Sequence, residues 1–333
     1  MKKILLPLII ASMTLVACQA HNNTSNENSE SSNGGAASAD VYYTPGDFSI
    51  VSPTGAPALA FYNYADLSNF ETNSTPTNIV AMMGAGQKDV VVLPTNAGMQ
   101  TILKQSEQTY KIAATITFGN FYLVSMGNDA DNVMNEGDTI RLFQKNNVPD
   151  KIFHYIYGDS FNANIHYVSA VNDAVTACIS GSFVDADTGT NMTPNYVLLA
   201  EPALSNVLSK KETITVYANI QEKYKEKSGN KEMFQASVFV KTSLEEGKVK
   251  LFLSSLEEDV EGAIADPTKL SAGMNKASNA QELFGVAPAM AENVLKKNNG
   301  MGLGFKYAKE NKAAIENFLT LFGLDGSNEA LYF

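Results

Sequence analysis

The sequence has very few of the side chains that build metal centres and charged clamps. Arg141 is its only arginine, tryptophan is absent, and there are three histidines. A bidentate arginine clamp on a carboxylate or phosphate can therefore form at one place only, and stacking on a ligand must come from Phe or Tyr. His21, His154 and His166 are scattered, and no group of Cys, His and Asp has zinc spacing. The sequence predicts neither a metal site nor a cofactor.

Basic residues are also outnumbered. The chain carries 24 Lys and Arg against 35 Asp and Glu, a net charge of −11. Without Lys2 and Lys3, which belong to the leader described next, the charge is about −13. A chain this acidic lacks the electrostatic footprint of a nucleic-acid-binding protein, so we expect no nucleic-acid partner and assign the acidic excess to solubility.

The first 18 residues have the order of a secretion signal. Met1–Lys3 is basic, Ile4–Val16 is apolar but short for a membrane span, and Leu15–Cys18 (LVAC) closes it. LVAC resembles the lipobox of bacterial lipoproteins, which implies that Cys18 is acylated and becomes the first mature residue. Acyl chains would hold the protein on the extracytoplasmic face of the cell membrane. The alternative is a secretory signal that contains Cys18 without lipidation.

A polar segment follows the leader. Residues 19–44, most clearly Gln19–Asp40, are dominated by Asn, Ser, Glu, Gly and Ala, which predicts a disordered tether. About 290 residues remain, enough for one large or two medium lobes. In that part Cys178 follows Ala174 and Ala177 at helical spacing, so we expect a small buried core residue with no disulfide partner once Cys18 is acylated.

The stretch Asp89–Asn96 (DVVVLPTN) is the clearest structural signal. Its run of valines predicts a strand buried on both faces of a parallel, helix-covered sheet. The strand runs into Pro94, after which Thr95 or Asn96 can cap a helix with Met99, Ile102 and Leu103 on one face. Open α/β sheets hold ligands at such strand-to-helix turns, although a single turn of this kind is more often purely structural.

Similar turns recur along the chain. We expect them after Phe48–Val51, Phe70–Ser74, Thr139–Phe143, Ile165–Val168 and Tyr196–Ala200. Asn172 and Asp173 are the expected cap of the helix that follows Ile165–Val168. Residues 109–126 exceed one ordinary strand, so two strands joined at Gly119 are expected, with a hinge where the chain changes sheet. Residues 234–240 can carry the chain back to the first sheet.

Three other segments are assigned more simply. Residues 221–232 read as a charged excursion, and Ser243–Glu246 as a capping box ahead of a long amphipathic helix. Asp185–Asn191 lacks the ligand spacing and closing Glu of a calcium loop, so a polar loop is favoured. The glycines of 300–304 lack the preceding strand of a dinucleotide fingerprint.

Together these segments resemble one family. The lipobox and tether, Ser52–Pro57 (SPTGAP), Thr75–Ala81 (TPTNIVA), Asp89–Asn96, Phe118–Val124 (FGNFYLV) and Leu199–Leu204 (LAEPAL) occur in the order found in ABC-transporter substrate-binding proteins related to the sulfonate, nitrate, taurine and thiamine-precursor binders. The resemblance implies the α/β type II periplasmic-binding-protein fold, with two lobes around a ligand cleft. Lobe one would comprise residues 45–120 and 237–333, and lobe two residues 121–236.

The resemblance also implies a function and a site. The protein would capture a small organic solute and deliver it, as a monomer, to an ABC permease with its ATPase. Backbone N–H groups at Gly55 and Asn96 would bind oxygen-rich groups, and Phe118 would form a stacking wall. Only Lys145 and, depending on strand alternation, Arg141 offer positive charge there, which leaves a neutral or heterocyclic solute open. The expected ligand contacts are Thr54, Gly55, Ala56, Thr75, Pro94, Thr95, Asn96, Thr117, Phe118, Asn120, Gln144, Lys145, Asn146 and Glu201.

Two other functions compete with transport. An enzyme on the same fold is disfavoured, because the predicted site has no histidine cluster and no paired carboxylates. A lipoprotein that senses or binds a protein without transport would favour an exposed aromatic patch, which sequence does not reveal.

Overall fold

The computed structural model describes residues 41–127, 133–158, 161, 163–297 and 299–333. The expected signal peptide, Cys18 and most of the expected tether lie outside the described residues. Within the described ranges, none of the helices combines the length and the apolar composition that a bilayer crossing requires.

A six-stranded sheet is built from three separate parts of the chain. Strands β2, β1 and β3 are parallel, and β12 lies between β3 and β4, antiparallel to both. Strand β13 closes the far edge, antiparallel to β4. In sheet order the strands are β13 (Leu303–Tyr307), β4 (Tyr110–Thr117), β12 (Ala236–Lys241), β3 (Val90–Pro94), β1 (Ile50–Pro53) and β2 (Phe70–Asn73).

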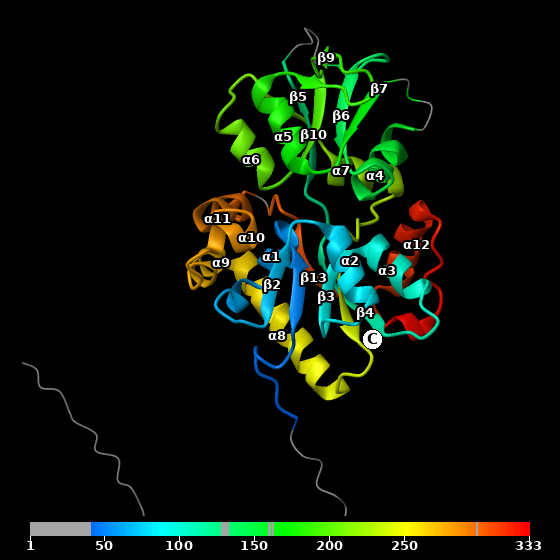
Figure 1. The fold of residues 1–333 in the computed structure, drawn as a ribbon, viewed down its shortest axis with the longest axis vertical. Coiled ribbons are helices and arrows are strands. Elements are labelled where there is room, and N and C mark those ends of the chain that lie inside the picture. Colours follow the sequence, from blue (N-terminus) through cyan, green and yellow to red (C-terminus); the bar gives the residue numbers. More distant parts are fainter. Residues whose placement is uncertain (1–40, 128–132, 159–160, 162, 298) are drawn as a thin grey trace, which may run out of the picture. The chain divides into compact units, whose positions relative to one another are not determined.

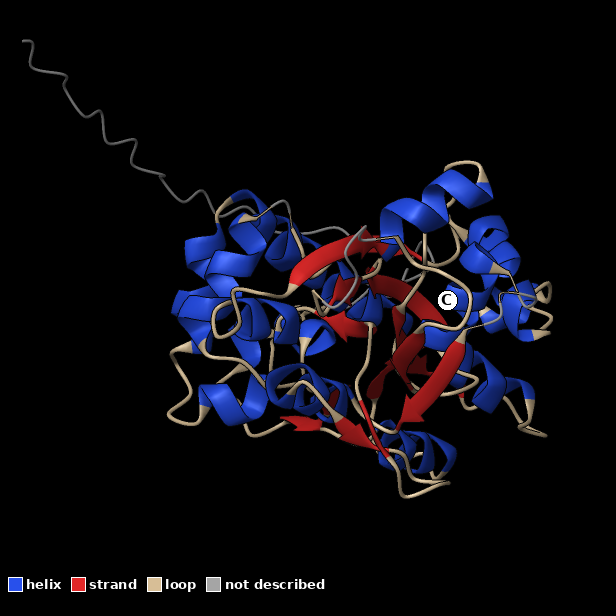
Figure 2. Ribbon diagram, turned by 90° about the horizontal axis from the view of Figure 1, so that it is seen from above, coloured by secondary structure: helices blue, strands red, loops and turns tan. Residues whose placement is uncertain are grey.

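Helices cover both faces of this sheet (Figures 1 and 2). Strand β3 shows why: Val90 and Val92 are fully buried in one core with α8, while Val91 and Leu93 are fully buried in the other with α2 and α3. This confirms the doubly buried strand predicted at Asp89–Leu93. The helices that pack here are α1 (Ala56–Leu59), α2 (Pro76–Gly84), α3 (Thr95–Leu103), α8 (Glu246–Ala265), α9 (Pro267–Met274), α10 (Ala280–Phe284), α11 (Pro288–Lys296) and α12 (Lys312–Leu319).

A second, five-stranded sheet is formed by one continuous stretch of chain. Its strands, in order, are β11 (Thr215–Asn219), β5 (Phe121–Ser125), β10 (Tyr196–Ala200), β6 (Thr139–Phe143) and β7 (Asn164–Val168). The helices α4 (Val148–Tyr157), α5 (Val171–Ser180), α6 (Ala203–Leu208) and α7 (Ile220–Ser228) pack on it, and β8 (Phe183–Val184) pairs with β9 (Asn191–Met192) as a small hairpin.

The chain passes between the two sheets twice, at residues 118–120 and again between α7 and β12 (Figure 1). The first passage contains Gly119 with φ +109°, and a Cβ there would lie 2.3 Å from side-chain atoms of Gln221 and Met233. Glycine is therefore required by both conformation and space. This confirms the predicted break of residues 109–126 at Gly119.

Several expectations about local structure were wrong. Neither sheet is purely parallel. Strands β5, β12 and β13 begin beside the carboxyl ends of their partner strands and therefore run antiparallel to them. Helix α3 starts at Thr95 with Pro94 as its N-cap, so neither Thr95 nor Asn96 caps it. The residues expected to be a charged excursion form α7, whose N–H groups at Gln221 and Glu222 are capped by Asn219.

Two further helix starts also differ from the prediction. Helix α8 begins at Glu246 with Glu245 at its N-cap and no side-chain cap bond, so the box at Ser243–Glu246 does not form. Helix α5 begins at Val171 with Ala170 at the N-cap, ahead of the expected cap at Asn172 and Asp173.

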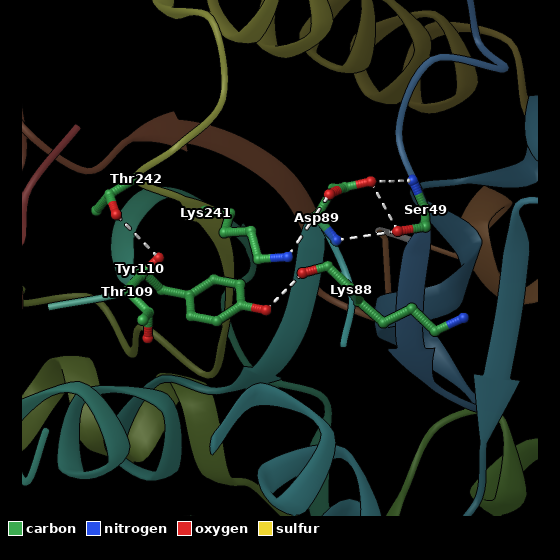
Figure 3. Close-up of polar contacts among 7 residues, drawn as sticks. All are labelled: Ser49, Lys88, Asp89, Thr109, Tyr110, Lys241 and Thr242. Carbon is green, nitrogen blue, oxygen red and sulfur yellow. Dashed lines mark hydrogen bonds and ion pairs between the residues drawn. The ribbon is translucent and has the colours of Figure 1, made fainter. Parts of the chain in front are cut away.

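A polar cluster joins the strand ends opposite those that run into helices (Figure 3). Asp89 Oδ2 accepts hydrogen bonds from Ser49 N at 2.9 Å and Ser49 Oγ at 2.7 Å, and Asp89 N donates back to Ser49 Oγ. Lys241 Nζ lies 3.9 Å from Asp89 Oδ1, and the Tyr110 hydroxyl donates to the Lys88 carbonyl. The cluster ties β1, β3, β4 and β12 together at this end of the sheet.

Candidate functional site

A cavity of about 570 Å³ lies where strands of both sheets end and run into helices. Its size is that of a small-molecule site. Its walls are Pro53, Thr54, Gly55, Ala56, Pro57, Ser74, Pro76, Pro94, Gln235, Ala236, Gln281, Gly285, Val286, Ala287 and Met290 on one side, and Asn120, Phe121, Phe143, Gln144, Ala170, Val171, Asn172, Val175, Ala200, Glu201, Pro202, Ala203, Asn206 and Lys210 on the other.

Helix N-termini surround this cavity. Residues at the starts of α1, α2, α3, α5, α6 and α11 all line it. Three of these helices, α1, α2 and α11, have a proline in their first turn, where its missing N–H costs nothing, and Pro202 is the N-cap of α6. The remaining first-turn N–H groups and the helix dipoles give the cavity a supply of hydrogen-bond donors.

The two chain passages are locked together at the cavity wall. Asn120 Nδ2 donates to the Glu201 carbonyl at 2.7 Å, and Glu201 N donates to the Asn120 carbonyl at 2.9 Å. Gln235 Nε2, from the second passage, donates to Asn120 Oδ1 at 2.9 Å. Asn120 is buried, so these bonds satisfy an amide that water does not reach.

Glu201 brings a buried carboxylate to the wall. Its side chain is 8% exposed, and its oxygens accept from Ser205 N at 3.0 Å and Ser205 Oγ at 2.8 Å. Burial raises the pKa of Glu201, although the two Ser205 bonds and the charge of Lys297 oppose the shift. Among the described residues no Lys, Arg or His nitrogen lies within 4.0 Å of this carboxylate.

Apolar side chains form the rest of the walls. Phe121 and Phe143 meet edge to face with ring centroids 5.9 Å apart, next to Val171 and Val175. Opposite them are Val286 and Met290. Lys210 is exposed, so its charge sits at the rim. The arrangement suits an organic solute with both a polar head and an apolar part.

Seven of the fourteen expected contact residues line the cavity: Thr54, Gly55, Ala56, Pro94, Asn120, Gln144 and Glu201. Gln144 adopts φ +57°, a left-handed conformation that is uncommon for residues other than glycine. Gly55 differs from expectation, because its N–H donates to the Phe284 carbonyl at 2.9 Å and is not available to a ligand.

The other seven lie outside the lining, four of them on the side of the six-stranded sheet. Thr75 is an exposed helix cap between two lining residues, Ser74 and Pro76. The Thr95 hydroxyl is buried and bonded to Ser237 Oγ at 2.7 Å. Asn96 and Thr117 are also buried, and neither Asn96 Oδ1 nor Thr117 Oγ1 has a partner among the described residues.

Phe118, Lys145 and Asn146 are held by other contacts. Phe118 packs edge to face on Phe234, with ring centroids 5.7 Å apart, and does not line the cavity, whose aromatic lining residues are Phe121 and Phe143. Lys145 Nζ lies 5.0 Å from the centre of the Tyr167 ring, and Asn146 N donates to Asp150 at 2.7 Å.

Arg141 also faces away from the cavity. It is buried, and its guanidinium carbon lies 4.0 Å from the centre of the Phe183 ring on the β8–β9 hairpin. Burial lowers its pKa, opposed by the charges of Asp185 and Asp173. The single arginine therefore supplies no ligand clamp in this cavity.

Sequence reasoning missed several polar lining residues, namely Asn172, Asn206, Lys210, Gln235 and Gln281. Four of them lie within or just after helices, where only the packing of the helix decides which residue reaches a cavity. Gln235 did carry a signal, since it lies at the start of residues 234–240, which were expected to return the chain to the first sheet. Among the described residues no group of three or more His, Cys, Asp or Glu could hold a metal ion.

No family model matches the sequence, and no curated protein matches it either. Solved structures do match. An ABC transporter structure from Parabacteroides distasonis is similar with a TM-score of 0.62 at 18% identity, covering 82% of this chain and 90% of that one. The chain has the periplasmic-binding-protein fold.

Two more structures extend the likeness. The periplasmic aliphatic sulphonate binding protein SsuA from Escherichia coli matches with a TM-score of 0.60 at 9% identity, covering 82% of this chain and 85% of its own. The ligand-binding component of an ABC-type import system from Staphylococcus aureus matches with a TM-score of 0.55 at 8% identity, covering 83% and 92%. The predicted two-lobed α/β periplasmic-binding-protein class is confirmed, with a six-stranded and a five-stranded sheet among the described residues. At these identities the likeness concerns the fold.

Proposed function

We propose that this protein is the extracytoplasmic solute-binding component of an ABC importer, which captures a small organic solute and delivers it to a membrane permease and its ATPase. The observation that carries the proposal is the cavity itself in a periplasmic-binding-protein fold. It has a volume of about 570 Å³, it is lined by residues that adjoin both sheets, and the two chain passages form one of its walls. Two bodies joined by short passages can close around a ligand by hinge motion.

The division into lobes is part of this proposal. Lobe one would be residues 45–120 and 237–333, and lobe two residues 121–236, each centred on one sheet. Acylation at Cys18 would keep the binding protein at the membrane that houses its permease.

Capture is favoured over catalysis by the lining. Its described residues include one carboxylate, Glu201, one lysine, Lys210, and neither histidine nor cysteine. Covalent or acid–base catalysis requires a nucleophile with a base, or two titratable groups with opposed roles, in contact with the substrate. The lining supports binding by hydrogen bonds and apolar contact instead.

Thermal unfolding with a panel of small solutes tests the function. A solute present at 100 times its Kd stabilises the folded state by about 2.7 kcal/mol, which raises the melting temperature by several degrees. A panel in which no compound raises the melting temperature, or in which one is chemically converted, would contradict the proposal.

A pair of tryptophan variants shows whether the shift arises in this cavity. Ala287 lines the cavity at the start of α11, whereas Ala289 is exposed on the same helix. We expect Ala287→Trp to abolish the ligand-induced rise by filling the cavity, and Ala289→Trp to preserve it. Equal rises in both variants would place binding elsewhere.

A further inference from the structure

The amides at the passages have only one consistent orientation. The Glu201 carbonyl can only accept, so the Asn120 side chain must present its NH₂ group there. Asn120 Oδ1 then faces Gln235, which must donate through Nε2. Gln235 Oε1 is left as the free end of this chain, and it has no hydrogen-bond partner among the described residues.

The same wall therefore carries two acceptors. Gln235 and Glu201 both line the cavity. The side chain of Asn120 links them, since it donates to the Glu201 backbone carbonyl and accepts from Gln235 Nε2. The Glu201 carboxylate receives both of its hydrogen bonds from Ser205, which leaves further lone pairs on each oxygen. Among the described residues no Lys, Arg or His nitrogen lies within 4.0 Å of this carboxylate, although the charge of Lys297 acts on it from farther away, so a cation of the ligand can be its direct ion-pair partner.

Two of the N–H groups at the helix starts around the cavity are already used. Ser205 N–H, in the first turn of α6, bonds to Glu201 itself, and Gly55 N–H bonds to Phe284. Lys210 stands at the exposed rim. Buried charges in proteins are normally paired, and a positive group of the ligand that binds to this carboxylate offsets part of the cost of burying it, so the wall is suited to a cation.

We infer that the solute carries a protonated nitrogen with N–H donors, as in organic amines, amidines and amino acids, and that this group binds to the Glu201 carboxylate. Gln235 acts as a positioning residue, since it orients Asn120 and adds the negative end of its amide dipole to the same wall. This inference rests on the proposed function and specifies the class of its ligand.

A matched panel tests the inference on the purified full chain. Each amine, amidine or amino acid is measured beside its hydroxyl isostere and beside amine-free carboxylates and sulfonates, by thermal shift and calorimetry. We expect binding among the nitrogen compounds and a loss of about 10-fold or more in affinity for the hydroxyl isosteres.

The variant Glu201→Gln removes the charge, keeps one oxygen to accept from Ser205 N and places an NH₂ group that can donate to Ser205 Oγ, so it should fold with a melting temperature near that of the parent. We expect it to lower affinity for the best nitrogen compound by about 10- to 100-fold. Glu212→Gln makes the same change at an exposed residue outside the cavity and should leave affinity unchanged.

The outcomes separate the two proposals. Binding of only amine-free anions or neutral solutes overturns the inference while the solute-binding function stands, as does a Glu201→Gln variant with unchanged affinity. The absence of any shift across the panel overturns both. If Glu201→Gln fails to fold, the preference of the parent protein for each amine over its isostere still decides the matter.

Discussion

At the scale of single residues, burial controls reactivity. Cys178 is fully buried on α5, and burial raises its thiol pKa to about 12. The thiolate that reacts with disulfide reagents is therefore scarce at pH 8. We expect the folded protein and its Cys178→Ser variant to titrate the same number of thiols, and to differ by one thiol in denaturant. A difference of one thiol under native conditions would show that the Cys178 thiol is accessible to the reagent in the folded protein.

The cluster around Asp89 supplies a second residue-scale prediction. Asp89→Ala leaves two partly buried donors of Ser49 without their charged acceptor, so we expect the free energy of unfolding to fall by about 1–3 kcal/mol in urea titrations. Asp187→Ala, at an exposed loop carboxylate, is the matched control and should change stability by less than about 0.5 kcal/mol. Equal losses would mean that the cluster adds nothing.

Single residues also show where sequence reasoning reaches its limit. The turns that hold the cavity could be predicted, because a buried strand followed by Pro or Gly and a helix is a local pattern. The direction of each side chain could not. Thr95 has the right chemistry at the right turn, yet its hydroxyl lies in a buried group with Ser237 and Thr115. Ser237 is 142 positions from Thr95 and 122 positions from Thr115 in the sequence, so only the fold brings these hydroxyls together.

At the scale of elements, close packing of α3 on β12 depends on a glycine. A Cβ at Gly98 would lie 2.1 Å from the Phe239 ring, so Gly98→Ala forces the ring to move. We expect a loss of about 1–3 kcal/mol in unfolding free energy despite the better helix propensity of alanine. Gly84→Ala, at the end of α2 where nothing lies within 4 Å, should be neutral or slightly stabilising. A neutral Gly98→Ala would show that Phe239 has room to move.

Elements were also where the sequence was most informative. Strands rich in Val and Ile were predicted within one or two residues, since their burial is written in consecutive apolar positions. The direction of the strands was not predicted. Strands β5 and β12 run antiparallel because each follows a passage that arrives at the carboxyl ends of the neighbouring strands.

At the scale of the whole molecule, the proposed hinge predicts a change of size. The two sheets are joined by residues 118–120 and by the segment after α7, so closure around a solute brings two otherwise separate bodies together. We expect the radius of gyration measured by small-angle X-ray scattering to fall on addition of a binding solute, and to stay constant for Ala287→Trp. An unchanged radius with saturating ligand would mean a site that is already closed.

The position of β12 has a consequence for the order in which the protein is made. The five-stranded sheet is contiguous from Phe121 to Asn219, whereas β12 must fit between β3 and β4. During synthesis the second sheet can fold as soon as it has left the ribosome, while the first waits with its central gap unfilled until residue 241 has emerged. A chain ending at residue 230 should therefore resist protease across 121–219 and be cut within 50–117. The six-stranded sheet, whose first strands come earliest in the sequence, is therefore completed last.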